Sequence, residues 1–129
     1  MPDGAENSTR AAVHTVIIQT TQMAALAEFY RYGLQLNPPA AHSDNHLGFA
    51  FDNLYLGIDQ VDVVAGQQPG AISLWFEVDD LNDTFQRFVE LGAPVRYEPT
   101  RKPWGAELAS VYDLDGNILG LAQRGTNPT

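Results

Sequence analysis

The sequence predicts an α+β fold of two β-α-β-β-β modules, whose curved mixed sheets form a shared cleft. Three observations lead to this fold class. A helical pattern follows a β-branched strand twice along the chain, and a tight polar turn joins two apolar runs near its end. The elements also coincide when the chain is shifted by 59 residues, which places Gly33 on Gly92. One such module alone would leave a sheet face open, whereas two can bury it together.

The first module is expected over residues 12–60. It opens with a strand at 13–19, because this run (VHTVIIQ) is rich in β-branched residues. Thr20 and Thr21 can cap the helix that follows, and Gly33 is expected to end it. The helix is predicted because apolar residues recur at i, i+3, i+4 and i+7, namely Met23, Leu26, Ala27 and Tyr30.

The rest of this module is predicted to be extended. A short strand is expected at 34–40, where Pro38-Pro39 would confine it to an edge or a bend. A hairpin then joins strands at 47–51 and 54–58 around Asp52-Asn53.

The second module is expected over residues 71–123. It repeats the order of the first: a strand at 71–78, a helix capped by Asp79 or Asp80 and ended by Gly92, and an extended piece at 93–97. The last hairpin turns at Asp115-Gly116-Asn117, where glycine tolerates positive φ.

Together the modules form a single domain over residues 12–123. Residues 1–11 are expected to be a flexible leader, 60–70 a polar linker and 124–129 a loose tail.

Composition excludes several functional classes. The formal charge is −9, with 16 acidic and seven basic residues, which argues against nucleic acid and anionic membrane surfaces as partners. The chain has no cysteine, so disulfides and thiolate metal sites are impossible. No apolar run approaches the roughly 20 residues of a membrane span, and the start lacks an apolar signal core. A cytoplasmic protein is therefore expected.

Three motifs carry a family resemblance. They are Leu114-Asp115-Gly116-Asn117 at the last turn, Phe29-Tyr30 followed by Gly33-Leu34 at the first helix end, and Trp104-Gly105 before the last hairpin. In this order and with this repeat, the chain resembles the vicinal oxygen chelate superfamily of glyoxalases, bleomycin resistance proteins and extradiol dioxygenases. Leu114 stands where that superfamily usually has proline. The resemblance covers residues 12–123 and implies the two-module fold.

The resemblance also implies four metal-ligand positions. His14 matches the first, whereas Ser73, Gly57 (or its neighbour Leu56) and Gly120 occupy the other three. A catalytic metal needs about three protein ligands, so we expect no bound metal and no other cofactor. A divalent metal remains the alternative.

Strand alternation assigns the faces of the predicted sheets. The all-apolar face of the strand at 71–78 should pack on the helices, and its mixed face, with Ser73, Trp75 and Glu77, should line the cleft. By the 59-residue shift, His14, Val16 and Ile18 join the cleft face. On the other strands the cleft residues are expected to be Tyr55, Gly57, Ile118, Gly120 and Ala122.

These assignments yield candidate site residues. The expected ligand-binding set is His14, Tyr55, Ser73, Trp75, Trp104, Glu107 and Gly120. Trp75 is expected on the cleft wall within reach of His14, beside space left by Ser73 and Gly120. The catalytic candidates are His14 and Glu107, either of which could act as an acid or base. The alternative without a catalytic role is a hydrogen-bonded strand histidine for His14 and a solvated carboxylate for Glu107. The segment from His42 to His46 could catch a metal, but loop polarity also explains it.

The expected function is the binding of a small, partly aromatic or apolar organic molecule without an obligatory metal. The resemblance implies a homodimer. One alternative is a metal-dependent lyase, isomerase, glutathione transferase or dioxygenase. Another is a metal-free enzyme that uses His14 or Glu107.

Overall fold

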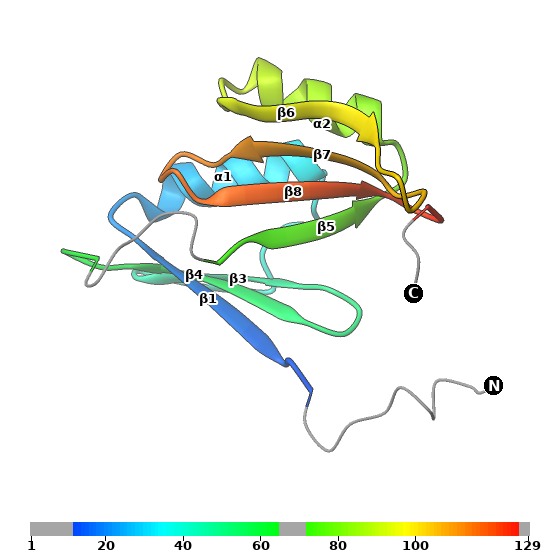
Figure 1. The fold of residues 1–129 in the computed structure, drawn as a ribbon. Coiled ribbons are helices and arrows are strands. Elements are labelled where there is room, and N and C mark those ends of the chain that lie inside the picture. The colour runs from blue at the N-terminus through cyan, green and yellow to red at the C-terminus, as the bar shows by residue number, and fades with distance from the viewer. Residues whose placement is uncertain (1–11, 65–71, 127–129) are drawn as a thin grey trace.

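The computed structural model describes residues 12–64 and 72–126, and it consists of two β-α-β-β-β modules (Figure 1). The first module comprises β1 (Thr15–Thr20), α1 (Met23–Leu34), β2 (Ala41–Ser43), β3 (His46–Ala50) and β4 (Tyr55–Gln60). The second comprises β5 (Leu74–Val78), α2 (Leu81–Glu90), β6 (Val95–Arg101), β7 (Glu107–Tyr112) and β8 (Ile118–Gln123). The predicted α+β fold is therefore confirmed. The leader, most of the linker and the last residues of the tail lie outside the described residues.

Each module forms one four-stranded mixed sheet. The strand orders are β1-β4-β3-β2 and β5-β8-β7-β6, and the parallel pairs are β1 with β4 and β5 with β8. Over the described ranges no strand pairing joins the two sheets, so they form no closed barrel. Figure 1 shows α1 and α2 behind the β5–β8 sheet, with β1, β3 and β4 crossing below it.

The helices hold the two modules together. Phe29 of α1 and Phe88 of α2 have ring centroids 5.1 Å apart, and both belong to a core that includes residues of both sheets. Gly33 lies in α1 directly under Phe88, because a Cβ there would sit 2.2 Å from Phe88 Cε1. The prediction that Gly33 ends the helix is thus wrong: close helix packing requires glycine there, and the chain turns at Gln35, which has a φ of 56°. Gly92 follows α2 with a φ of 90°, as predicted.

Two glutamines perform the same task in the two modules. Gln60 at the end of β4 accepts from the Met23 N–H and donates to the Thr21 carbonyl. Gln123 at the end of β8 accepts from the Leu81 N–H and donates to the Asp79 carbonyl. Each side chain therefore satisfies backbone groups at the start of its module's helix.

These equivalent positions, Met23 and Leu81, are 58 residues apart, not the predicted 59. The difference matters because a slip of one residue moves every strand side chain to the other face. On β5 the predicted faces hold, since Phe76 and Val78 pack on the core. On β1 they are inverted, since Ile18 packs on the core and Ile17 lies on the opposite face, 45% exposed.

Three local predictions are also wrong. The expected strand at 34–40 does not form, because α1 continues to Leu34 and the first sheet adds a short edge strand at β2 instead. The expected loop from His42 to His46 is the β2–β3 hairpin. The expected threonine cap is absent, since α1 has Gln22 at its N-cap and no side chain caps it from there. No helix in the part of the chain described here is long and apolar enough to cross a membrane.

Candidate functional site

Each sheet has an inner face, which packs toward the helices, and an outer face, which is turned away from them. On the first sheet, Leu56 and Ile58 are buried on the inner face, and the alternate residues of β4 lie on the outer face. On the second sheet, Leu119 and Leu121 are buried on the inner face, while Trp75 and Gly120 pair on the outer one. Candidate site residues are found in two places: a groove between the modules and the outer face of the first sheet.

The groove lies where the β3–β4 turn of the first module approaches β5 of the second. Its volume is about 450 Å³. The side chains around it are mostly apolar and come from both modules: Val16, Phe51, Leu54, Leu56, Leu74, Trp75 and Phe76, with Asp52, Asn53, Glu77 and Arg124 as the polar members. An apolar hollow with a few polar groups is the usual form of a small-molecule site.

Arg124 provides the positive charge at this groove. Its guanidinium lies 2.6 Å from Asp79 Oδ1 and 3.0 Å from Glu77 Oε1. The hydrogen bond and charge of Asp79, with smaller effects from Glu77 and Asp52, raise the pKa of Arg124 above its ordinary value. One guanidinium thus serves two carboxylates, and Asp52 also lines the groove, so the excess of negative charge disfavours an anionic ligand.

Trp75 forms part of the groove wall and lies flat over Gly120 of β8. A Cβ at position 120 would sit 2.0 Å from Trp75 Cδ2, so only glycine allows this contact. The indole N–H donates to Ser73 Oγ at 2.9 Å, and Trp75 remains 43% exposed. Ser73, Trp75 and Gly120 thus lie together, but the indole itself takes the space that was expected to stay open beside Gly120. Its exposed face is open to a planar ligand.

Tyr55 lies on the outer face of the first sheet, in a hydrogen-bonded chain with His46 and Asp59. His46 Nε2 is 2.6 Å from the Tyr55 hydroxyl, and His46 Nδ1 is 2.5 Å from Asp59 Oδ1. The two rings lie over paired glycines, since a Cβ at Gly48 would clash with the Tyr55 hydroxyl and one at Gly57 would sit 2.9 Å from His46 Cε1.

The remaining predicted site residues lie apart from both places. His14 is exposed just before β1, with Nδ1 2.5 Å from Thr15 Oγ1, and it does not line the groove. Trp104 is 59% exposed in the turn between β6 and β7. Glu107 pairs with Arg101 at 2.7 Å and lines a small hollow beside the start of α2.

The four implied metal positions do not fit a divalent ion. Gly57 and Gly120 have no side-chain donor, and neighbouring side chains fill the space that theirs would take: Ile17 and His46 at Gly57, and Trp75 at Gly120. His14 and Ser73 would leave one imidazole and one hydroxyl. Among the described residues there is no group of three His, Asp or Glu side chains arranged to hold a metal.

Asp59 is a functional candidate that was not predicted from the sequence, and His46 was predicted only as part of a loop that could hold a metal. The sequence pattern that indicates them is alternation: every second residue of β3 from His46 and of β4 from Tyr55 lies on the same face, with Gly48 opposite Gly57. Assigning 42–46 to a loop hid this alternation.

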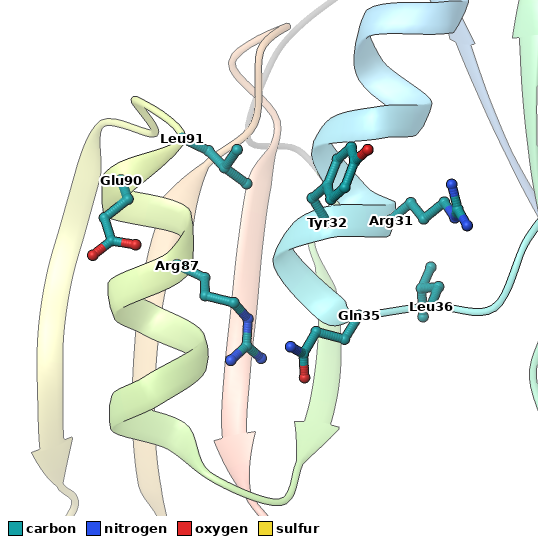
Figure 2. Close-up of a pocket in the computed structure, with 7 residues that line it drawn as sticks. All are labelled: Arg31, Tyr32, Gln35, Leu36, Arg87, Glu90 and Leu91. Carbon is teal, nitrogen blue, oxygen red and sulfur yellow. The ribbon is translucent and has the colours of Figure 1, made fainter.

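A second hollow, of about 470 Å³, lies between the C-terminal ends of the helices (Figure 2). Figure 2 shows Tyr32 and Leu91 on either side of the gap, and Arg87 reaching from α2 toward α1. Arg87 donates to the Gly33 carbonyl and to Asp83, so its charge is used in helix packing. Arg31 also lines the hollow and its Nε is buried without a hydrogen bond in the described structure. The hollow shares no residue with the groove.

Comparison with known proteins gives a consistent result. Residues 13–124 match the family model described as a glyoxalase-like domain. Among solved structures, a glyoxalase-related enzyme from Fulvimarina pelagi is 20% identical, with a TM-score of 0.78 over 91% of each chain. A glyoxalase/bleomycin resistance protein/dioxygenase family enzyme from Burkholderia phytofirmans is 16% identical, with a TM-score of 0.79 over 88% of this chain and 98% of that one.

A lactoylglutathione lyase from Agrobacterium tumefaciens is 18% identical, with a TM-score of 0.68 over 91% of this chain and 96% of that one. No curated protein matches the sequence. At these identities the structural matches establish the fold.

Proposed function

Because the chain belongs to the glyoxalase-like domain family of the vicinal oxygen chelate superfamily, we propose that it binds a small, planar and largely apolar organic molecule in the intermodule groove. The observation that carries this proposal is the groove itself, with residues of both modules around an exposed indole face. Aromatic stacking contributes about 0.5–1.5 kcal/mol beyond the burial of area.

Binding at this groove needs no metal. The donor set at the implied metal positions does not fit one, because two of the four residues are glycines. The charges at the groove disfavour an anionic ligand, since Arg124 is already paired with Glu77 and Asp79, and Asp52 adds a further carboxylate. We assign no catalytic role to His14 or Glu107, because the groove contains neither of them.

We also propose that the protein is a homodimer and that it is cytoplasmic. In the part of the structure described here, β1 and β5 are edge strands, so one side of each backbone is unpaired. Such edges favour association with a second copy.

Ligand binding is tested by fluorescence titration against a panel of planar aromatic molecules, in a Trp104→Phe background so that Trp75 is the sole reporter. We expect quenching of the Trp75 emission by at least one compound, and about tenfold weaker binding of that compound to Trp75→Ala, measured calorimetrically. Tyr32→Ala, at the helix ends, is the control and should leave affinity unchanged. Equal affinity of Trp75→Ala and the parent would contradict the proposed site.

The dimer is tested by sedimentation over a range of concentrations. The expected species has twice the 14.1 kDa chain mass. A monomer at every concentration would exclude the dimer and leave the groove proposal intact.

A further inference from the structure

The outer face of the first sheet carries a hydrogen-bonded cluster of side chains that lies outside the groove. Tyr55, His46 and Asp59 form one hydrogen-bonded chain along β3 and β4. All three are half-buried, with 29% of the His46 side chain and 35% of the Asp59 side chain exposed, so the chain is accessible from solvent.

The proton positions follow from the partners. An ionised carboxylate can only accept, so Asp59 fixes the proton of His46 on Nδ1. Nε2 is then an acceptor, and the Tyr55 hydroxyl donates to it. The lone pairs of the phenol oxygen are left for a donor outside the chain. This is the geometry of a base oriented by a carboxylate and acting through a hydroxyl.

The paired glycines make this arrangement rigid and flat. The Tyr55 hydroxyl occupies the space above Gly48, and the His46 ring the space beside Gly57. The two rings are nearly parallel, with an interplanar angle of 16°. The neighbouring Ile17, whose Cδ1 also lies over Gly57, adds an alkyl group beside these nearly parallel rings, a surface that suits a planar molecule.

We propose that Tyr55, His46 and Asp59 form a proton-transfer site that catalyses tautomerisation of a neutral, planar enol to its ketone. In the forward step, the enol O–H transfers its proton to the Tyr55 oxygen while the Tyr55 proton moves to His46 Nε2. The resulting enolate is left with an imidazolium that Asp59 stabilises. In the return step, Nε2 gives the proton back to Tyr55 while Tyr55 protonates the α-carbon, so that atoms and charge balance and no co-reactant is consumed.

Tyr55 is the catalytic residue in this scheme, because only its oxygen touches the substrate. His46 and Asp59 are positioning residues that act through it. The class of substrate follows from the surface: planar, because the platform is flat, and neutral, because the protein carries a formal charge of −9 and would repel an anion. This site is separate from the groove, since Tyr55 lies on the outer face and the groove takes the inner-face residue Leu56.

The test uses benzoylacetone, a neutral aromatic 1,3-diketone whose enol and ketone differ in ultraviolet absorption. The full-length protein should accelerate ketonisation over buffer, and Tyr55→Phe should reduce kcat by about 100-fold, the usual contribution of a general acid–base. His46→Gln should lower kcat to a similar extent with KM unchanged, a split that a purely structural role would not produce. Asp59→Asn should give a smaller loss, and Asp59→Glu should restore part of it.

Matched controls are His42→Gln and Tyr32→Phe, an exposed histidine and an exposed tyrosine outside the chain, which should retain the full rate. Circular dichroism verifies that each variant is folded. No acceleration by the parent protein, or equal rates for the parent and Tyr55→Phe, would overturn the proposal. Neither result would affect ligand binding at Trp75, so the two sites fail separately.

Discussion

Asp113 is a buried carboxylate that links the last hairpin to the first helix. Its Oδ1 accepts the backbone N–H groups of Asp115 and Asn117, and its Oδ2 accepts the Tyr30 hydroxyl at 2.7 Å. Tyr30 is only 1% exposed. A single side chain therefore both shapes the turn of one module and receives a hydrogen bond from the other.

Tyr30→Phe should destabilise the protein by about 1.5–3 kcal/mol, the usual contribution of a hydrogen bond to a charged group. Burial, and then the charge of Asp113, raise the pKa of Tyr30 well above its ordinary value of 10.0. The folded state thus keeps a proton that the unfolded state loses above pH 10, so the contribution of Tyr30 declines as the pH rises through that point.

Urea denaturation at about pH 7 and about pH 11 measures both effects. The difference in unfolding free energy between the parent and Tyr30→Phe should narrow at the higher pH. Tyr32→Phe, an exposed tyrosine of the same helix, is the control and should match the parent at both. A difference that widens with pH would contradict the sign argued here.

Gly120→Ala should lift the indole of Trp75 from the sheet, because the new methyl group would lie 2.0 Å from Trp75 Cδ2. We expect a red-shifted Trp75 emission, measured in a Trp104→Phe background. In a Trp75→Ala background the same change should have little effect on stability, because nothing then occupies that space. An unchanged emission would mean that the backbone yields instead of the indole.

At the scale of elements, the paired glutamines predict a measurable symmetry. Gln60→Ala and Gln123→Ala should each destabilise the protein by about 0.5–2 kcal/mol, the range for loss of a helix cap, because each frees groups at one helix start. Gln19→Ala, an exposed glutamine on β1, is the control. Thermal denaturation followed by circular dichroism compares them. A loss at only one of the two glutamines would show that the modules are not stabilised alike.

The elements were largely predictable from the sequence, because each depends on local patterns. Helical spacing predicted α1 and α2, and Asp115-Gly116-Asn117 predicted the last hairpin. The end of α1 was not predictable from local sequence. Glycine is needed at position 33 because the ring of Phe88, which is distant in the sequence, packs against it. The faces of β1 depended on a register that was wrong by one residue, which placed His14 on the same face as Trp75.

The candidate site was predictable only in part. Trp75, Ser73 and Gly120 come from β5 and β8 and were brought together by alternation and the repeat. His46 and Asp59 could not be paired with Tyr55 without knowing which residues of β3 and β4 lie opposite, and this register depends on a hairpin that had been expected to begin later.

At the scale of the whole molecule, the core belongs to both modules and should unfold as one unit. Tyr30 and Phe51 of the first module pack on Phe76 of the second, and Phe29 packs on Phe88. Far-ultraviolet circular dichroism reports both modules, whereas both tryptophans lie in the second. The two signals should give coincident thermal transitions, and Phe29→Ala should lower both together, with a loss of about 3–5 kcal/mol. Separate transitions would show that the modules unfold independently.

The position of β4 and β8 in their sheets has a consequence for synthesis on the ribosome. Each is the last strand of its module, yet each lies between two other strands of its sheet. The glutamine that accepts from the first N–H of each helix also lies on that last strand. A nascent chain that has emerged only as far as β7 therefore carries a β5 without its partner, and an α2 that Asp80 caps but that lacks the hydrogen bonds of Gln123. Release of β8 supplies the partner of β5 and the hydrogen bonds of Gln123 together, so the second module completes its fold as a single late event.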